Sequence, residues 1–150
     1  MTAPTDLQGF LERIVDALGL DASVRVEDDG ETLTGTVEGD ALGLFIGHHG
    51  QTIDAVQHLA TRTLLREDDE NRRRIVVDAD GYRDRRREAL EHQADEAADE
   101  ALRNGREVAL DPMSAAERRI VHEYLRDRAD VGTHSEGEGV DRRLVVSPAD

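Results

Sequence analysis

The sequence predicts an α+β fold built from two small modules. Stretches with hydrophobic residues at helical spacing alternate with short stretches of alternating polarity, which are typical of half-buried strands. The composition shifts near residue 82 towards Ala, Glu, Asp and Arg. A length of 150 residues with 37% hydrophobic residues suits two small domains with modest cores. We therefore expect one module at residues 1–80 and a second at 81–150, the second including a connecting helix at 82–104.

The first half of the N-terminal module is expected to be a helix followed by a hairpin. The pattern Thr5-x-x-Gln8 resembles a capping box, and hydrophobic residues then recur at helical spacing over 7–18. Polarity alternates at 24–26 and again at 33–37, which predicts two strands. The turn signal Asp-Asp-Gly at 28–30 lies between them and predicts the hairpin.

The second half of this module is expected to contain two helices and a strand. A short apolar stretch at 41–46 predicts one or two helical turns, and a Gly-His-His-Gly loop follows at 47–50. An amphipathic pattern at 53–64 predicts a longer helix, and the charged residues 66–71 predict a solvated loop. The apolar run at 75–77 predicts a third strand. The module therefore has the order αββααβ.

The C-terminal module begins with the connecting helix, which Asn104-Gly105 ends. Ser114-x-x-Glu117 is a capping box before a second helix, whose expected buried face includes Tyr124. The remaining elements are a short strand, this second helix, a Gly-rich loop or weak strand, and a last strand, at residues 108–110, 114–128, 132–139 and 144–146.

The loop Gly47-His48-His49-Gly50 is the main candidate site of the first module. Two glycines three residues apart let the backbone approach a ligand closely, because no Cβ stands in the way. The loop also precedes a helix N-terminus, where N–H groups and the helix dipole favour phosphate. The arrangement resembles the loop with which KH domains clamp single-stranded RNA. We therefore expect RNA contact at Gly47, His48, His49 and Gly50.

The sequence LFIGHHGQTIDAVQ, from Leu44 to Gln57, resembles the KH module of the bacterial Jag family, also called KhpB, and RIVVDADGYR at 74–83 continues the likeness. The resemblance covers about residues 6–148 and implies a type II KH domain with the order αββααβ. Such loops commonly carry Arg or Lys at the positions of His48 and His49. The sequence starts at the KH module, without the extra N-terminal domain of many family members, so we expect no function tied to that domain.

The second candidate site is the pair Arg118 and His122, which lie four residues apart on one flank of the predicted helix. The surrounding sequence DPMSAAERRIVH, at 111–122, resembles the R-three-H domain, which is named for this Arg and His. The segment SEGEG at 135–139 matches the Jag version of that domain. This resemblance implies helices packed on a small sheet and single-stranded nucleic acid as ligand, and the resemblance to the Jag family implies a small KH-domain protein as a possible partner. The R-three-H resemblance assigns the contact to Arg118 and His122. Three further arginines either assist binding or are ordinary solvated charges: Arg119, Arg142 and Arg143.

The charge of the chain limits how it can bind nucleic acid. The net charge is −15, whereas phosphate binding usually leaves a basic footprint. Residues 1–80 hold 17 acidic residues against 7 Arg, and residues 81–150 hold 17 against 12. Histidine is mostly neutral at pH 7 and charged below about pH 6.5. We therefore expect RNA affinity to rise as the pH falls from about 7.5 to 6; if backbone N–H groups alone make the contact, the profile is flat.

Other classes of function find little support in the sequence. Cysteine is absent, which excludes disulfides, thiolate catalysis and Cys-based zinc sites. His58 and His92 lack a second ligand at chelating spacing, and Ser135 has no nucleophile-elbow setting. We therefore expect no catalytic residue, metal or cofactor. No signal peptide and no apolar run long enough for a membrane span occur, so we expect a cytoplasmic protein without membrane insertion.

These observations predict a noncatalytic single-stranded RNA-binding protein that acts as an RNA chaperone or post-transcriptional regulator. Two alternatives stay open. The acidity of the first module favours a protein-interaction adaptor that uses the KH fold for dimerisation. The second module can instead bind single-stranded DNA.

Overall fold

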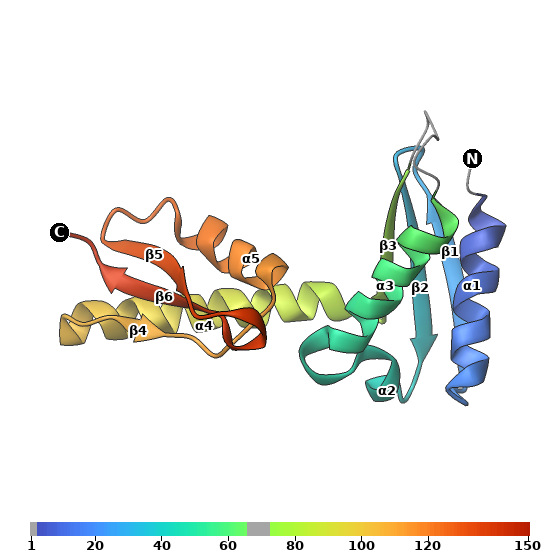
Figure 1. The fold of residues 1–150 in the computed structure, drawn as a ribbon, viewed down its shortest axis with the longest axis horizontal. Coiled ribbons are helices and arrows are strands. Elements are labelled where there is room, and N and C mark those ends of the chain that lie inside the picture. Colours follow the sequence, from blue (N-terminus) through green and yellow to red (C-terminus); the bar gives the residue numbers. More distant parts are fainter. Residues whose placement is uncertain (1–2, 66–72) are drawn as a thin grey trace. The chain divides into compact units, whose positions relative to one another are not determined.

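The structure is a computed structural model, which describes residues 3–65 and 73–150 (Figure 1). The backbone forms two compact units, Met1–Arg83 and Asp84–Asp150, called here the N-terminal and the C-terminal unit. Each contains a three-stranded sheet with helices, so the predicted α+β class is confirmed. The module boundary expected at residues 80 and 81 stays a prediction.

The elements of the N-terminal unit follow the predicted order αββααβ. They are α1 (Pro4–Ala17), β1 (Ala22–Asp28), β2 (Thr32–Gly39), α2 (Gly43–Ile46), α3 (Gln51–Leu64) and β3 (Arg74–Ala79). The strands lie in the order β1-β2-β3. β1 and β2 form the predicted antiparallel hairpin, whereas β2 and β3 run parallel, with Leu33 opposite Ile75. The charged loop predicted at 66–71 lies outside the described residues.

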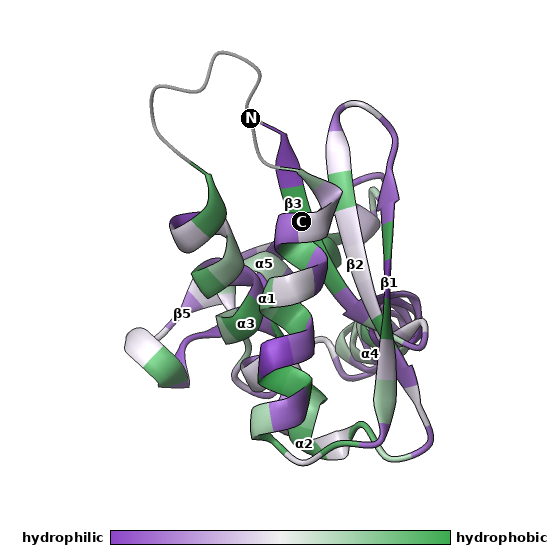
Figure 2. Ribbon diagram, turned by 90° about the vertical axis from the view of Figure 1, so that its right-hand side faces the viewer, coloured by the Kyte–Doolittle hydropathy of each residue, from purple (hydrophilic) through white to green (hydrophobic). Residues whose placement is uncertain are grey.

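The core of this unit lies between the sheet and α1 and α3. Every second residue of β2 is buried from Leu33 to Val37, as the alternating polarity predicts. Helix α1 is amphipathic, and its ribbon in Figure 2 alternates between hydrophobic and hydrophilic segments. The two helices bury three residues each: Leu7, Leu11 and Val15 from α1, and Ile53, Val56 and Ala60 from α3.

The cap of α1 differs from the predicted one. The helix begins at Pro4, so the N-cap is Ala3 and Thr5 lies inside the first turn. The Ala3 backbone N–H donates to the Asp6 carboxylate at 3.0 Å. The prediction from Thr5-x-x-Gln8 was therefore wrong in register, because Pro4 suits the first helical position and shifts the start of the helix towards the N-terminus.

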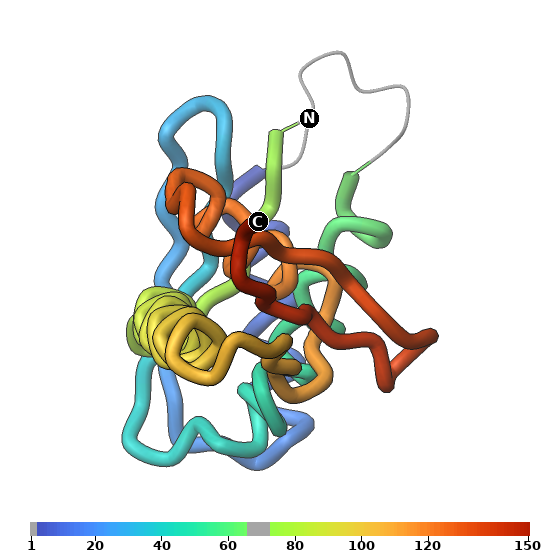
Figure 3. Tube along the Cα trace, turned by 90° about the vertical axis from the view of Figure 1, so that its left-hand side faces the viewer, coloured from blue at the N-terminus to red at the C-terminus, as the bar shows by residue number. Residues whose placement is uncertain are grey.

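The C-terminal unit packs two helices on an antiparallel sheet. Its elements are α4 (Tyr82–Asn104), β4 (Val108–Ala109), α5 (Ala115–Leu125), β5 (Val131–Glu136), a 3₁₀ turn η2 (Gly139–Asp141) and β6 (Arg143–Pro148). The strand order is β4-β6-β5. Figure 3 views α4 nearly along its axis, with the orange and red trace of α5, β5 and β6 to one side.

The core of this unit is rich in alanine on the α4 side. Leu90, Ala94, Ala97 and Ala98 of α4 pack in one cluster with apolar residues of α5 and the sheet: Val121, Leu125, Leu144 and Val146. Tyr124 does not belong to this face, because it is 40% exposed and its hydroxyl donates to Asp95. The sequence predicts either a loop or a weak strand at residues 132–139. The structure has a strand here, from Val131 to Glu136.

No helix in the described parts of the chain is both long and apolar enough to cross a lipid bilayer.

Candidate nucleic-acid interface

The loop between α2 and α3 requires glycine at both ends. Gly47 has φ 76° and Gly50 has φ 79°, values that favour glycine. A Cβ on Gly50 would lie 2.6 Å from the Tyr82 hydroxyl oxygen, and a Cβ on Gly47 would lie 2.8 Å from the Thr52 backbone nitrogen. The two glycines therefore serve the local fold, whatever the loop binds.

The two histidines of the loop face solvent. The segment His48–Gly50 forms a 3₁₀ turn in which His49 has φ 52°. The rings of His48 and His49 stack, with centroids 3.9 Å apart and planes at 26°. Helix α3 starts directly behind them, and no side chain in the described structure caps its N-terminus. The loop thus presents two exposed rings beside a helix end that favours anions.

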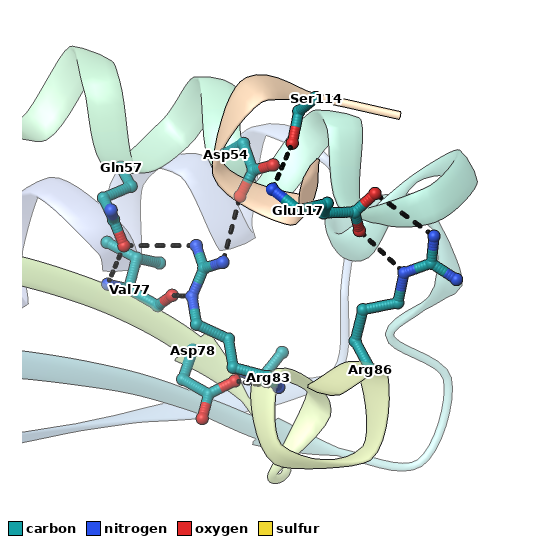
Figure 4. A network of polar contacts seen from close by, with 9 residues as sticks. Asp54, Gln57, Val77, Asp78, Arg83, Arg86, Ser114 and Glu117 are labelled. Carbon is teal, nitrogen blue, oxygen red and sulfur yellow. Dashed lines mark hydrogen bonds and ion pairs between the residues drawn. The ribbon is translucent and has the colours of Figure 1, made fainter. Parts of the chain in front are cut away.

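A network around Arg83 fixes α3 against the edge strand β3 (Figure 4). Arg83 Nε donates to the Val77 carbonyl at 2.7 Å, and Nη1 donates to Asp54 at 3.0 Å. Gln57 Oε1 accepts from Arg83 Nη2 at 3.1 Å and from the Val77 N–H at 2.9 Å. The start of α3 is thereby held in place, and the carboxylate of Asp54 near the loop is paired with a cation.

A groove of about 390 Å³ runs between α3 and the start of β3. Arg73 and Arg74 line it together with polar and apolar residues: Gln57, Thr61, Leu65 and Ile75. Arg73 forms an ion pair with Asp28 at 2.6 Å, whereas the Arg74 side chain is exposed. Sequence reasoning did not assign Arg73 or Arg74 to a site. The sequence feature that could have assigned these arginines to a site is their position at the start of a strand of the KH module.

The C-terminal unit has a groove of about 460 Å³ that brings four predicted site residues together: Arg118, Arg119, His122 and Arg142. Arg143 does not line this groove; it is exposed at the start of β6, opposite Glu136. The groove is also lined by three neighbouring residues of β5 that sequence reasoning did not assign: Thr133, His134 and Ser135. The glycine and polar residues of 131–136 give no clear strand signal in the sequence, and only the pairing with β6 places these three residues on a strand.

The arginines of this groove differ in how their charge is compensated. Arg118 Nη1 donates to the Met113 carbonyl and Arg142 Nη1 to the Gly137 carbonyl, each at 2.7 Å. In the described structure neither has a carboxylate partner, so both keep their charge for a ligand. Arg119 instead forms an ion pair with Glu123 at 2.9 Å, and this contact lowers the pKa of the Glu123 carboxyl.

Two histidines line the groove in different settings. His122 Nδ1 lies 2.5 Å from the Thr133 hydroxyl. His134 Nε2 lies 2.9 Å from Glu136, and the carboxylate of Glu107 also lies within 4.8 Å of these ligand atoms. The carboxylates beside His134 compete with any anionic ligand, so His122 is the better placed of the two for phosphate.

The capping box of α5 is half formed. Ser114 Oγ accepts from the Glu117 N–H at 3.2 Å, as predicted. The Glu117 carboxylate does not return to the N-cap and instead accepts from Arg86 Nε at 2.7 Å and Nη2 at 3.2 Å (Figure 4). This forked ion pair is largely buried and ties α5, which carries Arg118 and His122, to α4.

Comparison with known proteins places both units among characterised families. Residues 5–77 match the KH domain of KhpA/KhpB, and residues 88–148 match the R-three-H domain. The chain is 35% identical over 140 residues to the RNA-binding protein KhpB of Clostridium symbiosum, covering 92% of this chain and 63% of the relative.

Two further relatives carry the same name. Identity to the KhpB of Bacillus subtilis (strain 168) is 34% over 140 residues, which covers 92% of this chain and 67% of the relative. Identity to the KhpB of Lactiplantibacillus plantarum is 35% over 146 residues, which covers 97% of this chain and 45% of the relative. The chain thus spans 45–67% of the length of these relatives, and the similarity extends through both units.

Proposed function

The chain belongs to the KhpB family, and on that premise we propose that it binds single-stranded RNA without catalysing a reaction. The relatives are named RNA-binding proteins. The observation that carries the proposal is the groove of the C-terminal unit, where Arg118 and Arg142 lie with His122 and have no carboxylate partner in the described structure. Arginine in this setting suits forked phosphate contacts.

The loop Gly47–Gly50 has a complementary part in this proposal. Its glycines allow the turn and its exposed histidines lie beside the N-terminus of α3. A phosphate at this position meets backbone N–H groups and the helix dipole. The loop acts as a backbone clamp, and the arginines of the C-terminal groove supply most of the electrostatic attraction.

The biological role that fits this binding is an RNA chaperone or post-transcriptional regulator. Binding that relies on phosphates and backbone contacts depends little on sequence, which suits a protein that acts on many transcripts. The proposed location is the cytoplasm, where these transcripts are found.

Protein interaction is the second candidate function. Leu44 of α2 is 60% exposed and Leu59 of α3 is 53% exposed, so the two helices beside the loop present apolar side chains. This observation favours a protein partner on the N-terminal unit. Single-stranded DNA is the third candidate, since phosphate contacts from the arginines of the C-terminal groove do not distinguish the two kinds of strand.

One binding experiment separates these candidates. Labelled single-stranded RNA, single-stranded DNA and duplex RNA of matched sequence are titrated with the protein and followed by fluorescence anisotropy. We expect single-stranded RNA to bind most tightly. Equal affinity for the two single strands supports a ligand defined by phosphate alone, whereas absence of RNA binding, together with a dimer in light scattering, supports the adaptor.

A further inference from the structure

The imidazole of His122 is held from one side by Thr133. Nδ1 of His122 lies 2.5 Å from Oγ1 of Thr133, and both residues line the groove of the C-terminal unit. Strand pairing fixes Thr133 opposite Val146, and its β-branched side chain has few rotamers. The buried residues Val121 and Leu125 anchor the helix that carries His122. Two rigid elements therefore bring the hydroxyl and the ring together.

This contact determines which nitrogen of His122 faces a ligand. The two nitrogens lie on opposite sides of the ring, so a contact at Nδ1 leaves Nε2 accessible, and Nε2 has no protein partner in the described structure. A threonine hydroxyl can donate to Nδ1 of the neutral ring or accept from Nδ1–H of the protonated ring. In these two states Nε2 carries a proton that it can donate, whereas in the other neutral tautomer Nδ1–H donates to the hydroxyl and Nε2 carries no proton. A phosphate oxygen, which only accepts, is the matching ligand group.

We propose that Thr133 is a positioning residue for RNA binding, which fixes the ring of His122 so that Nε2–H donates to a phosphate oxygen in the groove. The inference rests on the proposed function and adds a residue that contacts the ligand only through His122. The charged groups near this ring include Arg118, Arg119 and Glu123 on the same helix and Arg142 after η2. The guanidinium groups of Arg118 and Arg142 attract a phosphate into the groove that the ring faces.

The test uses the full chain and compares two substitutions at one position. Thr133→Val removes the hydroxyl and keeps the branched shape, and Thr133→Ser keeps the hydroxyl. Thr34→Val is the matched control, because Thr34 is a half-buried strand residue of β2, outside both grooves. Thermal unfolding of each variant shows that the fold is retained.

Affinity for a labelled single-stranded RNA is then measured in a double-mutant cycle with His122→Ala. We expect Thr133→Val to weaken binding about three- to tenfold, the range for one lost hydrogen bond, while Thr133→Ser and Thr34→Val bind like wild type. In the His122→Ala background, Thr133→Val should cause no further loss. Additive losses would overturn the inference, because they would show that Thr133 acts independently of His122.

A second measurement needs no RNA. The nitrogen chemical shifts of the His122 ring report where the proton resides and whether Nδ1 accepts a hydrogen bond. We expect Nδ1 to accept in wild type and Thr133→Ser, and this signature to be lost in Thr133→Val; identical shifts in all three overturn the inference. If wild type shows this signature but binds no RNA, the proposed function fails, and with it the ligand role of Thr133.

Discussion

Glycine and histidine have different roles within the loop Gly47–Gly50. The glycines are required by the backbone, since their positive φ and the neighbouring side chains leave no room for a Cβ. The histidines are exposed and affect the fold little. Substitutions of the glycines therefore report on stability, and substitutions of the histidines report on binding.

Replacing Gly50 by Ala should destabilise the N-terminal unit by about 2 kcal/mol, because a Cβ there meets Tyr82 at a positive φ. Gly43→Ala is the matched control, since Gly43 lies in α2 with open space around the added methyl. Urea unfolding measures both. Equal stability of the two variants would show that close packing around residue 50 is not the reason why glycine occupies this position.

The pH dependence of RNA affinity measures how much the loop histidines contribute to RNA binding. Protonation adds positive charge beside phosphate, so wild-type affinity should rise several-fold between about pH 7.5 and 6. His48→Asn with His49→Asn should rise less, and asparagine tolerates the positive φ at residue 49. His58→Asn, an exposed histidine of α3, is the control. If RNA affinity depended on pH in the same way for wild type and the loop variant, the loop histidines would not contribute charge, and the loop would contact RNA through backbone N–H groups alone.

The residues that sequence reasoning could predict are those whose role is local. The loop at 47–50 and the pair Arg118 and His122 stand out in the sequence because spacing and neighbours define them. The contact of Gly50 with Tyr82, and that of His122 with Thr133, join residues far apart along the chain. Such partners follow from packing and strand register, which one sequence does not specify.

At the scale of elements, side chains that link helices and strands position the two sites. Arg83 joins α3 to the end of β3, and the Arg86–Glu117 pair joins α5 to α4. The predicted capping box at Ser114 identified the start of α5 correctly, but Glu117 takes a distant partner. Hydrophobic spacing therefore predicted where the elements lie, whereas the strand at 131–136 was left open because its glycine and polar residues resemble a loop.

Arg86→Ala should destabilise the C-terminal unit by about 2 kcal/mol, because it leaves the largely buried Glu117 carboxylate without its forked partner. Arg119→Ala is the control, since the Arg119–Glu123 pair is exposed and should contribute less than about 0.5 kcal/mol. Urea unfolding of the full chain, followed by probes in each unit, separates the two transitions. If Arg86→Ala lowers the free energy of unfolding no more than Arg119→Ala does, the Arg86–Glu117 pair does not stabilise the C-terminal unit as proposed.

At the scale of the whole molecule, binding must overcome an acidic surface. The net charge is −15, so any phosphate contact depends on local groups such as the arginines of the C-terminal groove. Family membership and the predicted α+β order could be established from the sequence, because both modules carry extended motifs. The sequence could not show which arginines lack a carboxylate partner, because charge pairing depends on the folded arrangement.

The salt dependence of RNA affinity counts the phosphates involved. Each phosphate in a single strand contributes about −0.7 to the slope of log K against log salt. Because only a few arginines line the two grooves of this acidic chain, we expect a shallow slope of about −1.5 to −3, equivalent to roughly two to four phosphates. A much steeper slope would mean that a larger basic surface forms on binding.

The most direct test of RNA contact at the loop Gly47–Gly50 is the affinity of three proteins for one labelled single-stranded RNA. The proteins are wild type, His48→Asp with His49→Asp, and the control His58→Asp with His92→Asp. Both variants change the net charge equally, but His58 and His92 are exposed and line neither groove. We expect the loop variant to bind roughly tenfold more weakly than the control. Equal affinity of the two variants would contradict RNA contact at the loop.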